Sequence, residues 1–340
     1  MRSSAKILDI AGYLPDKVLT NEELARLYPE WSAEKIYKKT GIRERHIATK
    51  EQTAGDLAFE AAKALFAKGN IKPDQVDFII LCTQAADYIL PTTACLLQAR
   101  LSVPHNAGAI DINVGCSGFV YGLSLAKGLI ETGAAKCILL LTADTYSKYI
   151  HPLDKSVRTL FGDGAAATAI IASDEGHMES IGPFIFGTDG SGGGDLIVEA
   201  GGFRKPKDEY TAIEKTDSYG NVRSAENLYM DGAEVMAFSL REVPIAVNLL
   251  LEKANRSRED VDYFVLHQAN KFMLEALQKK LKIPEEKLPI LMADSGNTVS
   301  STIPLALIKM QENDKFHGGR RLMLIGFGVG YSWAACFLNI

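Results

Sequence analysis

The chain has 340 residues, of which 47% are hydrophobic and 23% are charged, and its net charge is −5. This composition is typical of a globular protein with a sizeable core, and it excludes a disordered chain and the basic excess of a nucleic-acid-binding protein. No apolar run reaches the roughly 18 residues of a membrane span, and the five cysteines form no Cys-x-x-Cys pair. We therefore expect a soluble, cytoplasmic protein with reduced thiols and with neither a membrane nor a nucleic acid as partner.

The N-terminal part is predicted to begin with a strand near residues 7–10, followed by a turn at 12–15 and a helix that Asn21 caps. Several lysines lie in the stretch 31–40, before the charged segment Gly41–His46. This segment is interpreted as a loop, which is either a solvated surface or a site for an anionic ligand.

Short apolar stretches then alternate with stretches of helical periodicity. Thr53, with Asp56 three positions later, is typical of a helix start, and Gly69 is typical of its end. Further elements are expected as helices at 91–101 and beyond Cys116 as far as Gly133, and as strands at 76–82, 109–114, 136–142 and 164–171. Because these strands are almost wholly apolar, the pattern predicts an α/β fold whose sheet is covered on both faces.

The segment Gly115-Cys116-Ser117-Gly118 is predicted to be a corner between a buried strand and the next helix. A thiol in the first turn of a helix lies near unpaired N–H groups and the positive end of the helix dipole, so we expect a lowered pKa for Cys116. The alternative is that Cys116 is a small buried core residue, as most free cysteines are.

The second half of the sequence repeats the first. Residues 76–82 recur as 261–267, and the later matches follow in the same order, with Gly115-Cys116 on Gly296-Asn297, 137–141 on 322–325, and 164–170 on 330–336. We interpret this as a duplicated α/β unit. Its N-terminal half, 1–175, carries the cysteine, and its C-terminal half, 176–340, carries a histidine and an asparagine.

A pseudo-twofold axis would bring equivalent positions of the two halves together. Cys116 and Asn297 lie at matched corners, and His267 lies at the end of the strand predicted at 262–266. A thiol, an imidazole and an amide together supply a nucleophile, an acid/base or hydrogen-bond donor, and a fixed donor. Taken singly, His267 would be interpreted as a satisfied buried histidine and Asn297 could be a turn residue, so their positions in the repeat carry the functional interpretation.

Two glycine-rich segments remain. Residues 189–195 lack the setting of a dinucleotide fingerprint and are interpreted as a flexible loop. Residues 326–330 interrupt apolar sequence with glycines, as is needed where backbone approaches a ligand. One of their N–H groups is predicted to form an oxyanion hole with the N–H of Cys116; a plain turn between strands is the alternative.

Five motifs in this order resemble those of the β-ketoacyl-[acyl-carrier-protein] synthase III family of the thiolase superfamily. They are Gly115-Cys116-Ser117-Gly118-Phe119, Phe161-Gly162-Asp163-Gly164-Ala165, His267-Gln268-Ala269-Asn270, Gly296-Asn297-Thr298 and Gly326-Phe327-Gly328-Val329-Gly330. The resemblance implies a thiolase-like α/β fold of two duplicated halves stacked as αβαβα layers. It also implies a homodimer that needs no cofactor or metal and catalyses a decarboxylative Claisen condensation.

The resemblance also implies roles for individual residues. Cys116 would accept an acyl group from acyl-coenzyme A or an acyl-carrier protein, and malonyl-carrier protein would follow. His267 and Asn297 would donate hydrogen bonds to the malonyl thioester oxygen, and the N–H groups of Cys116 and Val329 would form the oxyanion hole. The product would be a 3-oxoacyl thioester.

Substrate-binding positions are carried over in the same way, and they are Leu90, Phe161, Gly232, Asn270, Lys39 and Lys155. Lys35 and Lys155 stand where the family has an aromatic residue and an arginine that hold the adenine of coenzyme A, and Lys39 stands for a usual arginine. Leu90 matches a residue that reaches into the partner's acyl pocket. These departures favour a specialised starter-unit synthase about as much as the enzyme that initiates fatty-acid synthesis.

Another class of enzyme fits the same trio. Cys116, His267 and Asn297 would also suit a cysteine acyltransferase or a thioester hydrolase that does not decarboxylate its substrate. Thiolase itself is disfavoured because residues 326–330 lack a second cysteine, and a non-catalytic subunit is disfavoured because the nucleophile is present.

Overall fold

A computed structural model of the protein describes residues 4–173, 180–313 and 318–340. Its first sheet has the strand order β1-β7-β6-β4-β5, in which β4 pairs in parallel with β5 and β6, whereas β7 pairs antiparallel with β6 and β1. The strands are β1 (Ser4–Tyr13), β4 (Phe78–Cys82), β5 (Gly108–Ile112), β6 (Cys137–Asp144) and β7 (Gly164–Ser173).

The second sheet repeats most of this topology in the order β13-β14-β15-β8, with β13 parallel to β14 and the other pairs antiparallel. Its strands are β8 (Ile181–Thr188), β13 (Tyr263–Leu266), β14 (Arg321–Gly328) and β15 (Ser332–Asn339). The order β1-β7-β6-β4 thus has a counterpart in β8-β15-β14-β13. The predicted division between 175 and 176 lies outside the described residues and stays a prediction.

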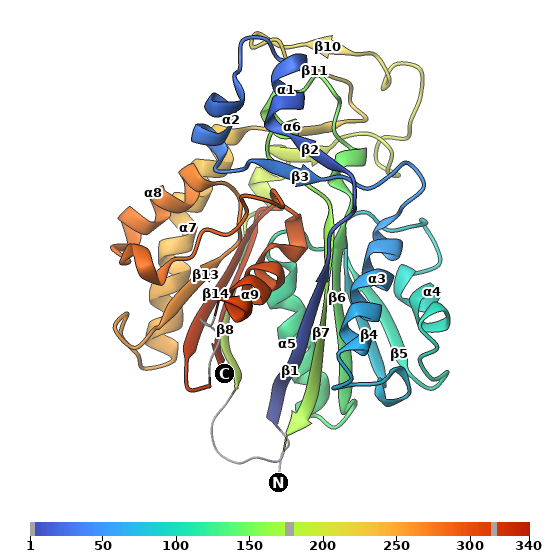
Figure 1. Ribbon diagram of the computed structural model, residues 1–340, viewed down its shortest axis with the longest axis vertical. Helices are drawn as coiled ribbons and strands as arrows, with labels where there is room; N and C mark the ends of the chain where they lie inside the picture. Colours follow the sequence, from blue (N-terminus) through green and yellow to red (C-terminus); the bar gives the residue numbers. More distant parts are fainter. Residues whose placement is uncertain (1–3, 174–179, 314–317) are drawn as a thin grey trace.

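Helices separate and cover the two sheets (Figure 1). The helices α5 (Gly118–Glu131) and α9 (Thr302–Glu312) lie between the sheets and contact strands of both. The first sheet is covered outside by α3 (Ala54–Ala67) and α4 (Thr93–Arg100), and the second by α7 (Gly232–Lys253), against which α8 (Lys271–Leu281) packs. The predicted five layers, αβαβα, are therefore confirmed.

The layers hold together because α5 buries apolar side chains against both sheets. Phe119, Leu123 and Ile130 are buried in one core cluster that includes residues of both sheets, among them Leu140 of β6 and Leu324 of β14. Each such side chain contributes roughly 1.5–3 kcal/mol by leaving water. No described helix is long and apolar enough to cross a membrane.

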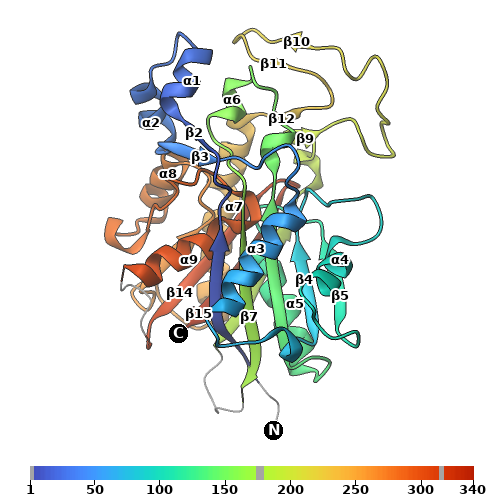
Figure 2. The ribbon, with the colours of Figure 1, turned by 45° about the vertical axis from the view of Figure 1, so that its right-hand side comes forward.

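The shorter elements gather above one end of the two sheets (Figure 2). They are β2 (Val18–Thr20), α1 (Asn21–Leu27), α2 (Ala33–Thr40), β3 (Glu44–His46), α6 (Lys155–Arg158), β9 (Leu196–Val198), β10 (Lys215–Thr216), β11 (Val222–Arg223) and β12 (Leu228–Met230). The turns on this end are the 3₁₀ helices at Tyr146–Lys148 and Gly190–Gly192.

Several local predictions were wrong in this region. Thr20, not Asn21, caps α1, since its hydroxyl accepts from the N–H of Glu23. The amide of Asn21 instead accepts a hydrogen bond from Arg45. β1 continues through Tyr13, where a turn was expected.

The charged segment Gly41–His46 is neither a solvated loop nor an anion site at Arg45. Its last three residues form β3, and Arg45 is completely buried, with its guanidinium on the carbonyl of Thr159 and the amide of Asn21. Residues 189–195, expected to be a flexible loop, form a 3₁₀ turn whose Asp189 exchanges backbone hydrogen bonds with Tyr331 at 2.7 and 3.0 Å.

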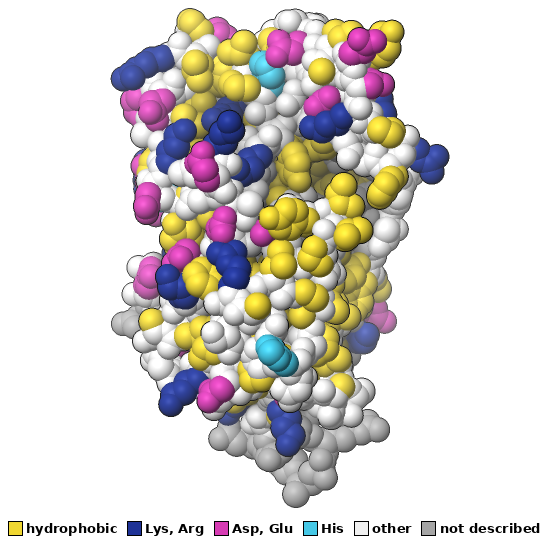
Figure 3. Space-filling model, turned by 90° about the vertical axis from the view of Figure 1, so that its right-hand side faces the viewer, with side chains coloured by type: hydrophobic (Ala, Val, Ile, Leu, Met, Phe, Trp, Pro, Cys, Tyr) yellow, Lys and Arg dark blue, Asp and Glu magenta, His cyan; other side chains and the backbone are white. Residues whose placement is uncertain are grey.

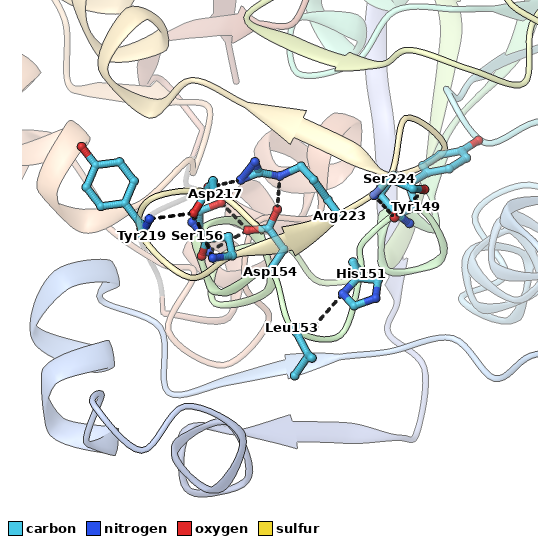
Figure 4. Close-up of polar contacts among 11 residues, drawn as sticks. Tyr149, His151, Leu153, Asp154, Ser156, Asp217, Tyr219, Arg223 and Ser224 are labelled. Carbon is cyan, nitrogen blue, oxygen red and sulfur yellow. Dashed lines mark hydrogen bonds and ion pairs between the residues drawn. The ribbon is translucent and has the colours of Figure 1, made fainter. Parts of the chain in front are cut away.

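The long segment 199–227 is anchored to α6 by ion pairs (Figure 4). The Arg223 guanidinium contacts Asp154 at 2.8 Å and Asp217 at 2.7 Å. Asp154 is fully buried and also accepts from Ser156, whose hydroxyl lies 2.5 Å away. Asp217 in turn accepts the N–H of Tyr219. Arg223 thus links Asp154, at the start of α6, to the turn that contains Tyr219.

Replacing Asp154 by alanine is expected to lower the free energy of unfolding by about 3 kcal/mol, because the Arg223 guanidinium then loses its buried partner. Chemical denaturation followed by circular dichroism measures this change. Glu60→Ala, which removes an exposed ion pair with Lys63, is the matched control and should change the free energy by about 0.5 kcal/mol or less. Equal effects of the two substitutions would contradict an anchoring role for Asp154.

Candidate active site

Cys116 lies where the first sheet meets α5. β5 ends at Ile112 and α5 begins at Gly118, so the predicted corner between strand and helix is confirmed. Ser117 is the N-cap residue, which puts Cys116 just outside the helix rather than in its first turn. Its side chain is buried, with 5% exposure.

His267 and Asn297 approach Cys116 from the other sheet. His267 directly follows β13, and its Nε2 atom lies 3.5 Å from Nδ2 of Asn297. The Asn297 side-chain oxygen accepts the N–H of Val299 at 3.0 Å, and this hydrogen bond fixes which way the amide faces. The NH₂ group of Asn297 is therefore the part directed toward the imidazole.

The other imidazole nitrogen has a hydroxyl partner. His267 Nδ1 lies 2.7 Å from Oγ1 of Thr302, at the start of α9. The same hydroxyl is 3.2 Å from the carbonyl of Val299. Because a hydroxyl both donates and accepts, its rotation decides which nitrogen of the imidazole carries the proton.

One cavity of about 60 Å³ brings most of the predicted site residues together. Its lining includes Cys116, His267, Asn297, Phe161, Gly232 and Asn270. Phe327 and Gly328 line it as well, whereas Val329 lines an adjoining groove of about 570 Å³. A larger groove of about 790 Å³ over the 199–229 segment contains none of the three predicted catalytic side chains.

Three predicted substrate-binding residues lie outside this cavity. Lys155 pairs with Glu30 at 2.9 Å and donates to the carbonyl of Tyr219 at 2.6 Å. Lys39 places its ammonium 4.8 Å from the centre of the Trp31 ring. Leu90 is 78% exposed at the surface.

The glycines of segment 326–330 let β14 lie close to Cys116 and Ser117 rather than to a ligand. A Cβ atom on Gly328 would lie 2.7 Å from Sγ of Cys116, and one on Gly326 would lie 2.6 Å from Cα of Ser117. Only glycine therefore lets β14 pass against the nucleophile. A hydrogen bond from the Val329 N–H to the Cys116 sulfur follows from this approach.

Comparisons with known proteins show the family of the chain. The sequence model of the 3-oxoacyl-[acyl-carrier-protein (ACP)] synthase III family matches residues 110–190, and the sequence model of the family's C-terminal part matches residues 251–340. The beta-ketoacyl-[acyl-carrier-protein] synthase III of Caldanaerobacter subterraneus is 38% identical over 336 residues, 99% of this chain and 98% of that protein. The chain belongs to the 3-oxoacyl-[acyl-carrier-protein] synthase III family. The resemblance drawn from the motifs is confirmed.

Solved structures superpose on the whole synthase. A 3-oxoacyl-(acyl-carrier-protein) synthase III crystal structure has a TM-score of 0.98 and 66% identity, over 99% of this chain and 100% of the other. The enzyme of Pseudomonas aeruginosa has a TM-score of 0.85 and 32% identity, over 99% and 98% of the two chains. A priming β-ketosynthase of the R1128 polyketide pathway has a TM-score of 0.84 and 28% identity, over 99% and 96%. The thiolase-like fold class is confirmed.

Burial controls the ionisation of Cys116 in this synthase. Burial first, and the Asp144 carboxylate second, raise the pKa of the Cys116 thiol to about 12, although the N–H groups of Val329 and Cys116 oppose the rise. The predicted lowering of this pKa is therefore wrong. Cys116 lies outside the first turn of α5, and desolvation of the thiolate outweighs the backbone dipoles.

Burial also keeps the imidazole neutral. It lowers the pKa of His267 to about 3, and no carboxylate among the described residues is hydrogen-bonded to the ring. Across the described ranges, no three or more His, Cys, Asp or Glu side chains are grouped to hold a metal ion. At neutral pH the synthase thus presents a thiol, an uncharged imidazole and an amide.

Sequence reasoning missed two polar residues next to this site. Thr302 contacts His267, and Gln84 lies beside Gly115 and Val329. Neither belongs to a recognisable motif, and Gln84 is separated from Cys116 by a helix and a strand. Only the offset of the internal repeat, which places Cys82 on His267, draws attention to the neighbourhood of Gln84.

The raised pKa predicts slow alkylation of Cys116 that accelerates with pH. Its rate of labelling by iodoacetamide should rise about tenfold per pH unit through pH 10, because the thiolate fraction rises in that proportion below the pKa. Site-resolved mass spectrometry measures the rate, with the exposed Cys95 as internal control. A plateau for Cys116 below pH 8 would contradict the desolvated thiol.

Proposed function

We propose that this synthase transfers an acyl group from a thioester to Cys116 and condenses it with malonyl-acyl-carrier protein to give a 3-oxoacyl product. The observation that carries the proposal is the convergence of Cys116, His267 and Asn297 on one small buried cavity. The family, in which curated relatives are named beta-ketoacyl-[acyl-carrier-protein] synthase III, supports the same reaction.

In the first half-reaction the Cys116 sulfur attacks the acyl thioester carbon. The new S–C bond forms as the donor's S–C bond breaks, and the thiol proton leaves on the released donor thiol. The N–H groups of Cys116 and Val329 are the proposed oxyanion hole for the tetrahedral intermediate. The hydrogen bond between the Val329 N–H and the sulfur supports this assignment, because it puts that donor at the reacting centre.

In the second half-reaction malonyl-carrier protein loses carbon dioxide. The electron pair of the broken C–C bond passes to the thioester, and the enolate oxygen accepts hydrogen bonds from Nδ2–H of Asn297 and Nε2–H of His267. This step uses the tautomer in which the Thr302 hydroxyl donates to Nδ1 of His267. The enolate carbon then attacks the acyl carbonyl on Cys116, and the collapsing intermediate expels the Cys116 sulfur as a thiolate, which takes a proton from solvent water. The spacing of 3.5 Å between the two nitrogens is compatible with both donors meeting one oxygen.

The environment of His267 favours condensation over hydrolysis. A thioester hydrolase needs its histidine as a general base, and such a base is normally oriented by a carboxylate that stabilises the imidazolium. Here the partner of Nδ1 is the hydroxyl of Thr302, and burial lowers the pKa of His267 to about 3. A ring that resists protonation suits a neutral hydrogen-bond donor.

The substrate arm is proposed to pass Phe161, Gly232 and Asn270 on its way to Cys116. The Asn270 side-chain oxygen caps α8 by accepting the N–H of Met273 at 2.9 Å, so its NH₂ group is left for the substrate. Lys39 and Lys155 are proposed contacts for the charged part of the donor, and Lys155 would have to exchange its ion pair with Glu30. We propose no metal or cofactor for either step, and a cytoplasmic enzyme with reduced thiols.

We also propose a homodimer that forms over β5 and the loop between β4 and α4. Figure 3 faces the side of the molecule that carries α4 and β5, and hydrophobic side chains gather there. The exposed apolar residues of this side include Tyr88, Ile89, Leu90 and Ile110, the last of them on the edge strand β5. An apolar edge of this kind is typically covered by another chain. Leu90 would then enter the acyl pocket of the second copy.

Alanine at His267 or Asn297 should reduce the rate at which carbon dioxide is released from malonyl-carrier protein by a factor of about 10²–10³, because each substitution removes one donor to the enolate oxygen. Acylation of Cys116, followed by intact-mass spectrometry, should persist in both variants. Cys116→Ala should abolish labelling and condensation together. Hydrolysis of acyl thioesters without release of carbon dioxide would instead identify the alternative hydrolase.

The double variant Ile89→Asp/Leu90→Asp should shift the protein from dimer to monomer, because two charges would be buried at the apolar contact. Size-exclusion chromatography with light scattering measures the mass. Phe272→Asp, which charges an exposed aromatic residue on α8 at the opposite outer layer, is the matched control and should remain dimeric. A dimer that survives the double substitution would contradict the proposed interface.

A further inference from the structure

The groove of about 570 Å³ that adjoins the Cys116 cavity is lined by polar as well as apolar side chains. Gln84, Tyr146 and Val329 all line it, and Leu196 is shared with the cavity. The groove therefore continues from the nucleophile, where an acyl chain on Cys116 would extend. Its polar residues are not explained by the condensation chemistry.

Gln84 is held rigidly at this position. Its backbone N–H donates to Asp144 Oδ1 at 2.9 Å, and its backbone carbonyl accepts from the Tyr149 hydroxyl at 3.0 Å. Its side-chain oxygen accepts from the Tyr146 hydroxyl at 2.5 Å. Backbone and side chain are thus both fixed by neighbours, which is how a binding group is preorganised.

The amide of Gln84 lies beside the reacting centre. A Cβ atom built on Gly115 would lie 2.4 Å from Gln84 Oε1 and 2.7 Å from a Val329 methyl carbon. Gly115 directly precedes the nucleophile, and Val329 contributes the proposed oxyanion N–H. The Gln84 amide therefore lies close to the place where the first carbons of an acyl chain on Cys116 would be.

The orientation of the amide follows from Tyr146. Burial raises the pKa of Tyr146, so its phenol stays protonated and donates, and Gln84 is its acceptor among the described residues. The oxygen of the Gln84 amide must then face Tyr146. The Nε2 group keeps its two N–H donors, for which the described residues provide no acceptor.

We propose that Gln84 Nε2 binds an oxygen on the acyl chain close to the thioester, so that Cys116 prefers an acyl group bearing a hydroxyl or carbonyl there over a plain alkyl chain. This inference rests on the proposed acylation of Cys116 and specifies its substrate class. An alkyl chain against Nε2 would displace water and leave a fixed donor unpaired. A site built to bond an oxygen rejects the analogue that lacks it.

The step itself is an ordinary transacylation. The S–C bond of the donor thioester breaks, the S–C bond to Cys116 forms, and the cysteine proton goes to the released thiol. The substituent oxygen takes no part in bond changes and only accepts a hydrogen bond from Gln84. No oxidant or reductant is involved.

Three pantetheine thioesters with four-carbon acyl groups test the inference. Butyryl, 3-hydroxybutyryl and 3-oxobutyryl thioesters share one arm and one chain length, and they differ only at the third carbon. The second-order rate of Cys116 acylation, followed by intact-mass spectrometry, should be at least tenfold higher for an oxygenated thioester than for butyryl. Equal or higher rates with butyryl would overturn the inference.

The variant Gln84→Met keeps an unbranched side chain but removes the donor. The rate ratio between oxygenated and plain thioesters should fall to about one in this variant. A ratio that persists in folded Gln84→Met, judged by its melting temperature, would also overturn the inference, as would a uniform loss with all three donors. Failure of every thioester to label wild-type Cys116 would instead contradict the proposed function itself.

The variant Tyr146→Phe provides a second readout. It leaves the Gln84 amide in place but frees its oxygen to rotate toward the groove. The advantage of the 3-oxo group, which only accepts hydrogen bonds, should fall more than that of the 3-hydroxy group, which also donates. Identical behaviour of the two oxygenated donors in this variant would contradict the assigned orientation.

Discussion

The close contact between β14 and the Cys116 corner is the constraint on which the site depends. Gly326 and Gly328 allow this strand of the second sheet to pass against Cys116 and Ser117, directly before α5. Ser117 and Ser332, far apart in the sequence, share a hydrogen bond of 2.8 Å across the same seam. A larger residue at either glycine would separate the sheets at the point where thiol, imidazole and amide must meet.

Asp144 links the two sides of this seam below the site. It is fully buried at the end of β6, accepts from Gln84, and accepts from the Ser300 hydroxyl at 2.5 Å on the other side. Burial raises its pKa to about 7, and its field raises the pKa of Cys116. One carboxyl thus positions Gln84 and disfavours the Cys116 thiolate.

Much of the fold could be predicted because apolar periodicity is a local property of the sequence and because the internal repeat can be recognised by comparing the two halves. The strands around Ile80 and Leu140 and the corner at Cys116 were found in this way. The convergence of His267 and Asn297 on Cys116 followed from matching the two halves rather than from any single motif. That inference held because a repeat restricts which positions lie near its axis.

The remaining features depend on contacts that no local pattern encodes. Arg45 looks like part of a charged loop, but carbonyl and amide partners distant in sequence allow its burial. Lys155 is held by Glu30 and by the carbonyl of Tyr219, and neither partner could be recognised from the residues around it in the sequence. The pKa of Cys116 depends mainly on its burial, and the residues around it in the sequence do not reveal how deeply it is buried.

The uncharged state of the resting site explains how one cavity can serve two half-reactions. A permanent thiolate or imidazolium would bind water and ions in the cavity. Thiol, neutral imidazole and amide instead leave the cavity almost without charge until a substrate brings its own. In the proposed reaction, His267 and Asn297, held by Thr302 and Val299, act as donors only when an enolate oxygen forms between them. Since fixed dipoles in a dry cavity need no reorganisation, they stabilise that developing charge more strongly than water would.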